Sequence, residues 1–521
     1  MRPAQSKLLL IISGAIIFNI IFWNEKLGVN AVLFDIFICA AVITQFPFSL
    51  KNNISKWLFA GHLITTTLLI IQNTIVSKIS FSITLLLFIS FSQYIHRSAL
   101  YAGGSVLLNY VLFVPGFFNE LKEIKGKGIN GRKWFKNYRM LLIPLSILAI
   151  FLIIYASANT VFSDIFLEGI PAVQNWLNNF FYLLPLERLG FLTAGFAIVG
   201  GLLLRSRSTY FSDVDCKQNN NLFRKKNSFK KWKKSSWADM LTLITGKKAN
   251  GILALKNEYV TGTISLVLLN ILLVIINFID VKYVWLGFSY SHDRSMAAYV
   301  HEGAGMLILS IVLAMFLLLF FFRGNLNFYK RNKWLRYGAY LWIFQNCFLV
   351  LSVLMRDYYY ISHYGLAYKR IGLLFFLAMV LSGLFTIFIK ICYNKTAYYL
   401  LRVNAWVAIV LLVFASAFHW DKNIAEYNIA RKSLVPVDVS FLLSLSDEAL
   451  PIIQKHKDVL VNDKYDTFYY NGNYYNASMF FEYRKKDFFT QQKQYTWLSW
   501  NATDANVKRE LSTTPPVSSL K

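Results

Sequence analysis

Twelve long apolar runs constrain the fold of this chain more than any other feature. A run of about 20 apolar residues is long enough to cross a bilayer as an α-helix. Transmembrane β-strands would instead alternate apolar and polar residues, and these runs do not. We therefore predict an all-α membrane protein with about 11 or 12 transmembrane helices. The runs are Leu8–Trp23, Ala31–Leu50, Trp57–Val76, Phe81–Ile95, Ala99–Phe118, Met140–Ala156, Leu189–Leu204, Val260–Ile279, Gly303–Phe322, Tyr337–Met355, Ile371–Ile391 and Val403–Phe418.

Charge is scarce in this chain, and its distribution orients the predicted helices. Only 16% of the 521 residues are charged, well below the roughly one quarter of a soluble domain. The net charge is +27, and much of it lies in two basic loops, residues 119–139 and 205–257. Loops rich in Lys and Arg mark the cytoplasmic side and attract anionic lipid head groups. No nucleic-acid module surrounds them, so we expect lipid partners and no nucleic acid.

We expect a bacterial inner-membrane protein. Placing both basic loops on its cytoplasmic side puts the tail, residues 420–521, on the extracytoplasmic side. Five crossings before residue 119 would then put the N-terminus on the outer side, whereas Arg2 and Lys7 favour the cytoplasmic side. The conflict disappears if one run does not cross. We suspect Ala99–Phe118, whose Gly103-Gly104 and Pro115 suit a re-entrant or tilted segment.

The same reasoning divides the chain into six parts. Residues 1–118 form N-terminal membrane helices, and the first basic loop, 119–139, follows them. Residues 140–204 form a membrane hairpin with an interfacial outer segment. The second basic loop, 205–257, leads into a membrane core at 258–419 and then into the tail. For the tail we predict a small α+β fold. Its hairpin signal is Asn471-Gly472-Asn473 between the aromatic segments Lys464–Tyr470 and Tyr474–Tyr483.

Charged and aromatic residues gather where three predicted spans end on the outer side. Lys369 and Arg370 stand against the positive-inside bias and at a helix N-terminus, where the helix dipole disfavours cations. Glu302 and Asp357 could compensate them in an ion-pair clamp, or the cations could bind an anionic ligand. Both explanations stay open. The cluster comprises His301, Glu302, Arg356, Asp357, His363, Tyr364, Tyr368, Lys369 and Arg370.

Several polar residues lie inside the predicted spans. Intramembrane polar groups are costly and often mark a pathway, and Asp35 could relay protons. For Asn and Gln we expect hydrogen bonds between helices. His301-Glu302 lacks the second His of a His-Glu-x-x-His zinc motif, because Gly305 stands there. We predict no catalytic residue, metal or cofactor. The polar residues are Asp35, His62, Gln72, Asn73, Asn270, Asn277 and Asn346.

Several motifs resemble an uncharacterised family of multi-pass bacterial membrane proteins. That family is domain of unknown function 4173, related to domain of unknown function 4153, and this chain looks like a Bacteroidetes-type member. The resemblance implies a multi-pass membrane fold and no activity. This chain has Asn159 where the family often has Asp. The matching stretches are Tyr299–Gly303, Tyr364–Arg370, Ile424–Arg431, Leu442–Asp447, Ala449–Pro451, Asp438 and Trp500-Asn501.

Three classes of function fit these features. The first is an envelope protein that binds or senses a ligand or a protein partner through the outer cluster. The second is a transporter of a small polar or anionic solute. The third is a membrane-embedded enzyme acting at the outer face, which we favour least, because it needs the outer His, Glu and Arg side chains to converge.

Overall fold

A computed structural model describes residues 3–125, 186–223, 254–286 and 296–513, apart from residue 48 and the short segments 323–324, 330, 435–436, 462–466 and 471–472; a few single positions between 144 and 155 are also described. The run Met140–Ala156, the outer segment 159–185 and most of both basic loops lie outside this part.

The chain forms two compact units. Unit 1 comprises Met1–Cys216, Ala415–Ala417 and Arg484–Thr513, and unit 2 comprises Lys217–Phe414 and Phe418–Tyr483.

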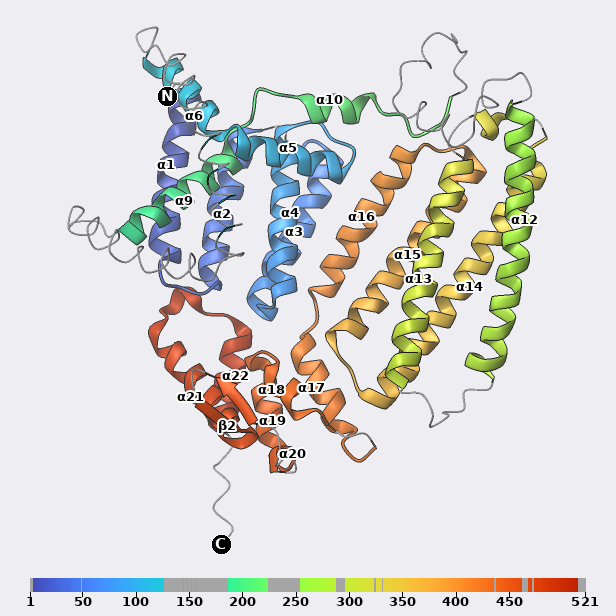
Figure 1. Cartoon of the computed structure of the whole chain (residues 1–521). Helices are drawn as coiled ribbons and strands as arrows, with labels where there is room; N and C mark the ends of the chain where they lie inside the picture. Colours follow the sequence, from blue (N-terminus) through green and yellow to red (C-terminus); the bar gives the residue numbers. More distant parts are fainter. Residues whose placement is uncertain are drawn as a thin grey trace. The chain divides into compact units, whose positions relative to one another are not determined.

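Unit 1 is a helical bundle with an apolar core (Figure 1). Fully buried Ile11, Ile38, Phe88 and Val199 join four of its helices in that core. Its described helices are α1 (Pro3–Phe22), α2 (Val29–Gln45), α3 (Asn53–Gln72), α4 (Ile75–Gln93), α5 (Ala99–Val111), α6 (Phe113–Lys125), α9 (Leu186–Leu203), α10 (Tyr210–Lys217), η6 (Trp497–Ser499) and α22 (Ala502–Thr513).

The suspected fifth run is not one straight helix. α5 and α6 meet at Leu112 with a bend of 60°. Pro115 lies in the first turn of α6, where its missing N–H costs no hydrogen bond. A bent pair of this kind is either a broken span or a re-entrant segment, so the prediction that this run does not cross stays a prediction.

Contacts inside unit 1 place its helix ends on two sides. At one end the Val29 N–H donates to the Trp500 carbonyl at 3.0 Å, and the Thr503 hydroxyl donates to the Ile71 carbonyl at 2.8 Å. The fit is close, because a Cβ on Gly28 would lie 2.5 Å from the Trp500 oxygen. At the other end of α1, Lys7 pairs with Glu120 at 3.1 Å. The segment around η6 and α22 therefore lies at the end of α1 opposite Lys7.

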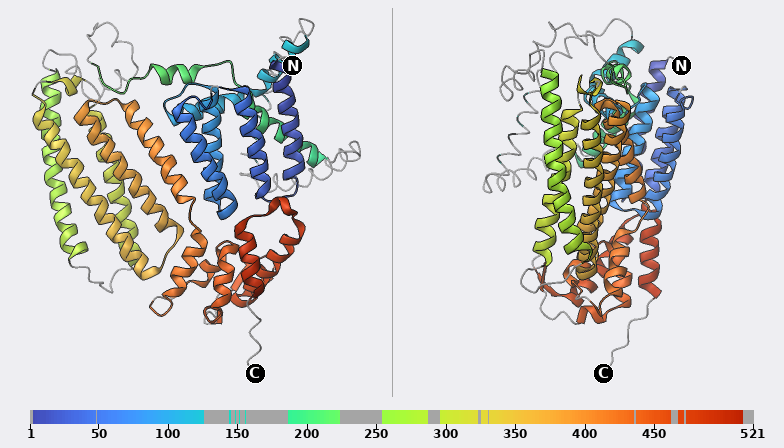
Figure 2. Two further views of the ribbon diagram at one scale, coloured as in Figure 1. Left: turned by 180° about the vertical axis from the view of Figure 1, so that it is seen from behind. Right: turned by 90° about the vertical axis from the view of Figure 1, so that its right-hand side faces the viewer.

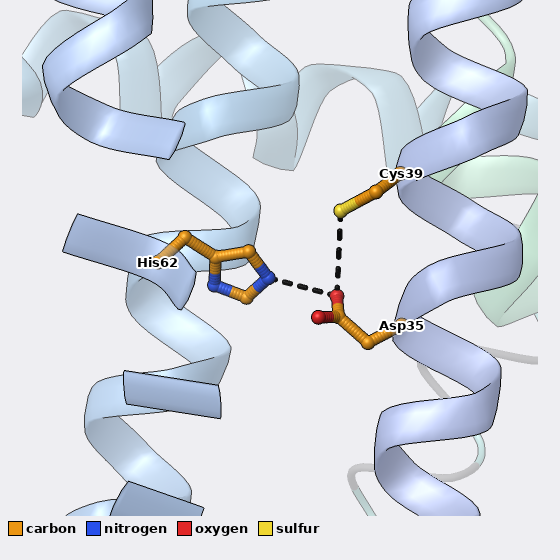
Figure 3. Close-up of side chains that lie close together, drawn as sticks. All are labelled: Asp35, Cys39 and His62. Carbon is orange, nitrogen blue, oxygen red and sulfur yellow. Dashed lines mark hydrogen bonds and ion pairs between the residues drawn. The ribbon is translucent and has the colours of Figure 1, made fainter. Parts of the chain in front are cut away.

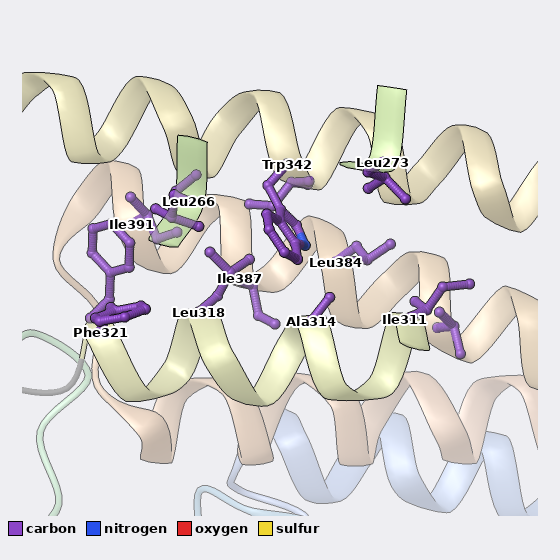
Figure 4. Close-up of a cluster of buried hydrophobic side chains, with 14 of the residues drawn as sticks. Leu266, Leu273, Ile311, Ala314, Leu318, Phe321, Trp342, Leu384, Ile387 and Ile391 are labelled. Carbon is purple, nitrogen blue, oxygen red and sulfur yellow. The ribbon is translucent and has the colours of Figure 1, made fainter. Parts of the chain in front are cut away.

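Unit 2 contains long helices that run alongside one another, as α12–α15 do in both views of Figure 2. Leu266, Leu318, Trp342 and Ile387 join four helices in its buried apolar core (Figure 4). The elements are α12 (Ala254–Asp280) with a π-helical turn η3 (Val281–Trp285), α13 (Met296–Phe321), η4 (Asn325–Phe328), α14 (Lys333–Tyr364), α15 (Tyr368–Tyr393), α16 (Ala397–Ala415), α17 (Trp420–Ala430), α18 (Val439–Ser444), η5 (Asp447–Ala449), α19 (Leu450–Lys455), α20 (Asp458–Val461), β1 (Thr467–Tyr470), β2 (Asn473–Asn476) and α21 (Ala477–Gln494), which continues into unit 1.

Amide side chains hold α12 against α14. Asn270 donates to the Gly338 carbonyl at 3.0 Å and accepts from Gln345 at 2.6 Å. Asn277 donates to the Gln345 carbonyl at 3.3 Å. The predicted interhelical role is confirmed for both asparagines. Asn346 donates to the Trp342 carbonyl of its own helix at 2.8 Å, and its interhelical role stays a prediction.

The α+β prediction for the tail is not supported, because the described tail is helical apart from one antiparallel pair of short strands. β1 pairs with β2 in the register Thr467↔Asn476. The predicted second strand ends there, because the Asn476 side chain accepts from the Met479 N–H at 2.8 Å and starts α21. Phe481 and Phe488, seven residues apart, are both buried, so a helical period overrides the β-propensity of this aromatic segment.

Seven described helices are long and apolar enough to cross a membrane, or eight if the bent α5–α6 pair counts as one span. Two further apolar helices are shorter, α2 and the Gly305–Phe321 part of α13. The chain is thus a multi-pass helical membrane protein.

The contacts of unit 1 predict which of its surface positions share a side of the membrane. In a variant without native cysteines, Asn24→Cys and Lys508→Cys should react with a membrane-impermeant thiol reagent from one side, and Arg207→Cys from the other. Arg207 marks the Lys7 end, since it pairs with Glu123 of α6 at 2.9 Å. Labelling of all three from one side in intact cells would contradict this arrangement.

Candidate functional site

Unit 1 buries a cluster of polar side chains between three of its helices. Asp35 comes from α2, His62 from α3 and Thr84 from α4, with 2%, 0% and 3% of their surfaces exposed. His62 is the tenth residue of the 20-residue α3, and Thr84 is the tenth of the 19-residue α4. Asp35 is the seventh residue of the 17-residue α2, so the cluster lies near the middle of these helices.

Asp35 and His62 face each other directly (Figure 3). The His62 Nε2 lies 2.8 Å from the Asp35 Oδ1, and the Thr66 hydroxyl donates to the other carboxylate oxygen at 3.0 Å. The Cys39 thiol approaches Oδ1 at 3.5 Å. On its far side the imidazole meets the Thr84 hydroxyl, with its Nδ1 at 3.0 Å. We call Asp35, Cys39, His62, Thr66 and Thr84 the buried cluster.

Helical periodicity brings these side chains together. Asp35 and Cys39 are four residues apart on α2, and so are His62 and Thr66 on α3, so each pair lies on one face of its helix. Apolar residues predominate in both helices. A polar side chain that faced lipid would be left without a partner, so both faces turn inward toward each other.

The cluster can hold either a shared proton or a cation. A buried carboxylate is stable only when donors surround it, and three donors meet Asp35. The ligand atoms of Asp35, Cys39 and His62 all lie within 4.8 Å of one another, close enough to bind one metal ion. Sequence reasoning singled out Asp35 and His62 separately and expected no metal ligands. The i, i+4 spacing of Asp35 and Cys39 was the one available signal.

A second buried network joins the α4–α5 connection to α10. Asp215 is fully buried and accepts from the backbone N–H groups of Arg97 at 2.7 Å and Ser98 at 3.0 Å. His96 lies between Asp215, at 3.3 Å, and Ser105, at 2.9 Å. Burial lowers the pKa of His96 although Asp215 acts in the opposite direction. These contacts tie the α4–α5 connection to α10 and to Ser105 of α5, so we assign this network to the fold.

The predicted outer cluster lies in unit 2, and its first cation is already paired. Arg356 forms a buried ion pair with Asp280, at the end of α12, a partner that the sequence analysis does not name. The carboxylate of Asp357 is also buried, and Arg370 is within electrostatic range of it. The backbones of His301 and Glu302 belong to the start of α13, but their side chains lie outside the described part of the structure.

The guanidinium of Arg370 also contacts groups within the protein. Its guanidinium donates to the carbonyls of Tyr364 and Gly365 and lies 4.3 Å from the centroid of the Tyr360 ring. Tyr368 donates to Asp421 of α17. Two of the exposed members are His363, which meets the Tyr359 carbonyl of its own helix at 3.1 Å, and Lys369. Arg356 and Arg370 therefore contact groups within unit 2, and both explanations of the cluster stay predictions.

Helix α17 packs against the turn between α14 and α15. Asn428 accepts from the Leu366 N–H at 2.6 Å and donates to the Leu366 carbonyl at 3.0 Å. Gly365 adopts φ 79°, and a Cβ there would lie 2.4 Å from the Asn428 oxygen. Two of the sequence motifs described above, Tyr364–Arg370 and Ile424–Arg431, thus meet in one packed corner.

Neighbouring threonines offer a matched test of the buried cluster. Thr66→Val removes a donor from buried Asp35 and should lower the free energy of unfolding by about 1–3 kcal/mol. Thr67→Val, one position on, should change it little, because the exposed Thr67 hydroxyl bonds only to the Leu63 carbonyl. Thermal unfolding in detergent measures both. Equal effects would show that Thr66 does not support Asp35.

The lowered pKa of His96 predicts a pH dependence of stability. A neutral imidazole is favoured in the folded state, so the unfolded chain binds more protons, and the free energy of unfolding should fall below about pH 6.5. His96→Gln should flatten the dependence of Tm on pH between about 5 and 8. His363→Gln, at an exposed histidine, is the control. An unchanged slope in His96→Gln would exclude His96 as its cause.

Comparison with known proteins identifies the chain at the level of its family. Neither curated proteins nor solved structures give a match. One family match covers residues 36–456, most of the chain, from directly after Asp35 to the end of α19. This protein belongs to the family described as Domain of unknown function (DUF4153).

Proposed function

We propose that this membrane protein is a transporter and that the buried cluster is its solute site. One observation carries the proposal: two ionisable side chains, Asp35 and His62, face each other at 2.8 Å near the middle of apolar helices, almost fully buried. Intramembrane ionisable groups are costly, and in transporters the solute site lies near the middle of the bilayer. A buried carboxylate repels an anion, so the solute is polar or cationic.

Helix packing alone gives a weaker account of this pair. In unit 2 the neutral amides of Asn270 and Gln345 hold α12 against α14. Amides would serve equally between α2 and α3 and would avoid burying a carboxylate. The Asp–His pair therefore calls for a task that amides cannot perform, such as binding a charged species.

The envelope-binding and enzyme alternatives have less support. Arg356 and Arg370 are two of the three cations that a ligand could use, and both contact groups within unit 2. The narrower predictions belong here as well. Four predictions from the sequence analysis stay predictions. They are location in the inner membrane, an extracytoplasmic tail, partners among anionic lipids and envelope proteins, and membership of domain of unknown function 4173 in a Bacteroidetes-type bacterium.

Cys39 provides a native reporter for solute access. A transporter must open its site to water, so Cys39 should react with a small water-soluble thiol reagent even though only 7% of its surface is exposed. The test uses the full chain in proteoliposomes with Cys216, Cys347 and Cys392 replaced by Ser. Labelling is followed by mass spectrometry over minutes to hours.

A second variant keeps only Cys347, which packs against the apolar core of unit 2. Cys39 should react at least tenfold faster than Cys347, and both should react fully after denaturation. Equal slow reaction of the two cysteines in the folded protein would overturn the proposal, because the site would then never open to water.

A further inference from the structure

The buried cluster brings together the three kinds of ligand atom that transition metals prefer. Asp35 offers oxygen, His62 nitrogen and Cys39 sulfur, all within 4.8 Å of one another. We infer that the cluster binds one borderline-soft divalent ion of the Zn²⁺ class. This inference rests on the transport function proposed above and names its solute.

The spacing of the ligand atoms is close to that of a metal site. Zinc bonds of about 2.0–2.3 Å in tetrahedral geometry place ligand atoms roughly 3.3–3.7 Å apart. The Cys39 Sγ and Asp35 Oδ1 are 3.5 Å apart, and the His62 Nε2 and Asp35 Oδ1 are 2.8 Å apart. The Cys39 Sγ and the His62 Nε2 lie within 4.8 Å of each other. Binding of the ion would lengthen the Nε2–Oδ1 distance by about half an ångström. A fourth position is left for water, as in sites that exchange ligands.

Outer hydrogen bonds already orient two of the three ligands. Thr66 holds the second oxygen of Asp35 at 3.0 Å, which leaves Oδ1 directed toward the other ligands. Thr84 meets the His62 Nδ1 at 3.0 Å and so directs Nε2 toward Asp35. Such partners fix the orientation of ligands in metal sites and strengthen binding.

Charge balance also favours a divalent ion. A carboxylate, a thiolate and a neutral imidazole carry two negative charges together, which one divalent cation neutralises. Neutrality matters here because an uncompensated charge in a low-dielectric interior costs several kcal/mol. The sulfur ligand selects against Mg²⁺ and Ca²⁺, which prefer oxygen, and the mixed nitrogen, oxygen and sulfur set suits Zn²⁺ or Co²⁺.

Cys39 is the residue that the hydrogen-bond network explains least. Its thiol is a weak donor, at 3.5 Å from an oxygen that His62 already meets at 2.8 Å. A metal ion gives this sulfur a strong role, since a coordinated thiol loses its proton. Cys39 is therefore the best position at which to separate metal binding from folding.

Cobalt provides a direct spectroscopic test. The full chain, purified without a polyhistidine tag and treated with a chelator, is titrated with Co²⁺ and then with Zn²⁺. We expect one Co²⁺ per chain, a thiolate-to-cobalt charge-transfer band, and displacement of Co²⁺ by Zn²⁺ but not by Mg²⁺. Cys39→Ser should lose the band and bind at least tenfold more weakly, whereas Cys347→Ser should match the native protein.

Each other outcome decides the inference. A band that survives in Cys39→Ser, or no stoichiometric Co²⁺ binding, overturns the metal assignment. If a variant fails to fold, the rise in Tm of the native protein with Zn²⁺ but not with Mg²⁺ decides, and its absence overturns the assignment. Labelling of Cys39 without metal binding would leave the transporter proposal intact. Metal binding without labelling of Cys39 would overturn the transporter proposal. The ion would then be a structural metal that stabilises the fold.

Discussion

The need to pair every polar group inside a lipid-facing helix controls this structure more than any other interaction. Hydrocarbon offers no hydrogen bonds, so each such group must find its partner within the protein. Several such pairs occur among the described helices. Amides join α12 to α14, Lys390 donates to the Phe322 carbonyl at the end of α13, and Arg356 pairs with Asp280. Asp35 pairs with His62, and Thr66 and Cys39 lie beside the same carboxylate.

Small residues allow the helices of unit 1 to approach closely enough for this pairing. A Cβ on Gly200 of α9 would lie 1.9 Å from the Phe113 ring, and one on Gly201 would lie 2.3 Å from the Tyr110 ring. These contacts pack α9 against the bent α5–α6 pair. Close packing of backbones stabilises helix contacts in membranes, where apolar burial between helices contributes little. The bend at Leu112 thus belongs to the packed interior of unit 1.

Sequence predicted the helices far better than their side-chain partners. The run Ile371–Ile391 lies within α15, Tyr368–Tyr393, because bilayer thickness fixes helix length and apolar composition reveals it. The partner of Arg356 could not be read in this way. Asp280 stands one residue beyond the run Val260–Ile279, and its pairing depends on how α12 and α14 are rotated about their axes. The Asp35–His62 pair, 27 residues apart, was hidden for the same reason.

In the proposed transporter, the buried cluster would also limit how the solute site opens. Separating α2 from α3 without a bound solute would remove the His62 and Thr66 donors from Asp35 and leave a carboxylate unpaired, at a cost of several kcal/mol. A cation or incoming water that takes over those contacts lowers this cost. A ligand shifts a conformational equilibrium only by its difference in affinity for the two states, and here that difference arises at Asp35 itself. In the proposed transporter, the Asp35–His62 pair would therefore couple opening of the site to the arrival of a cation.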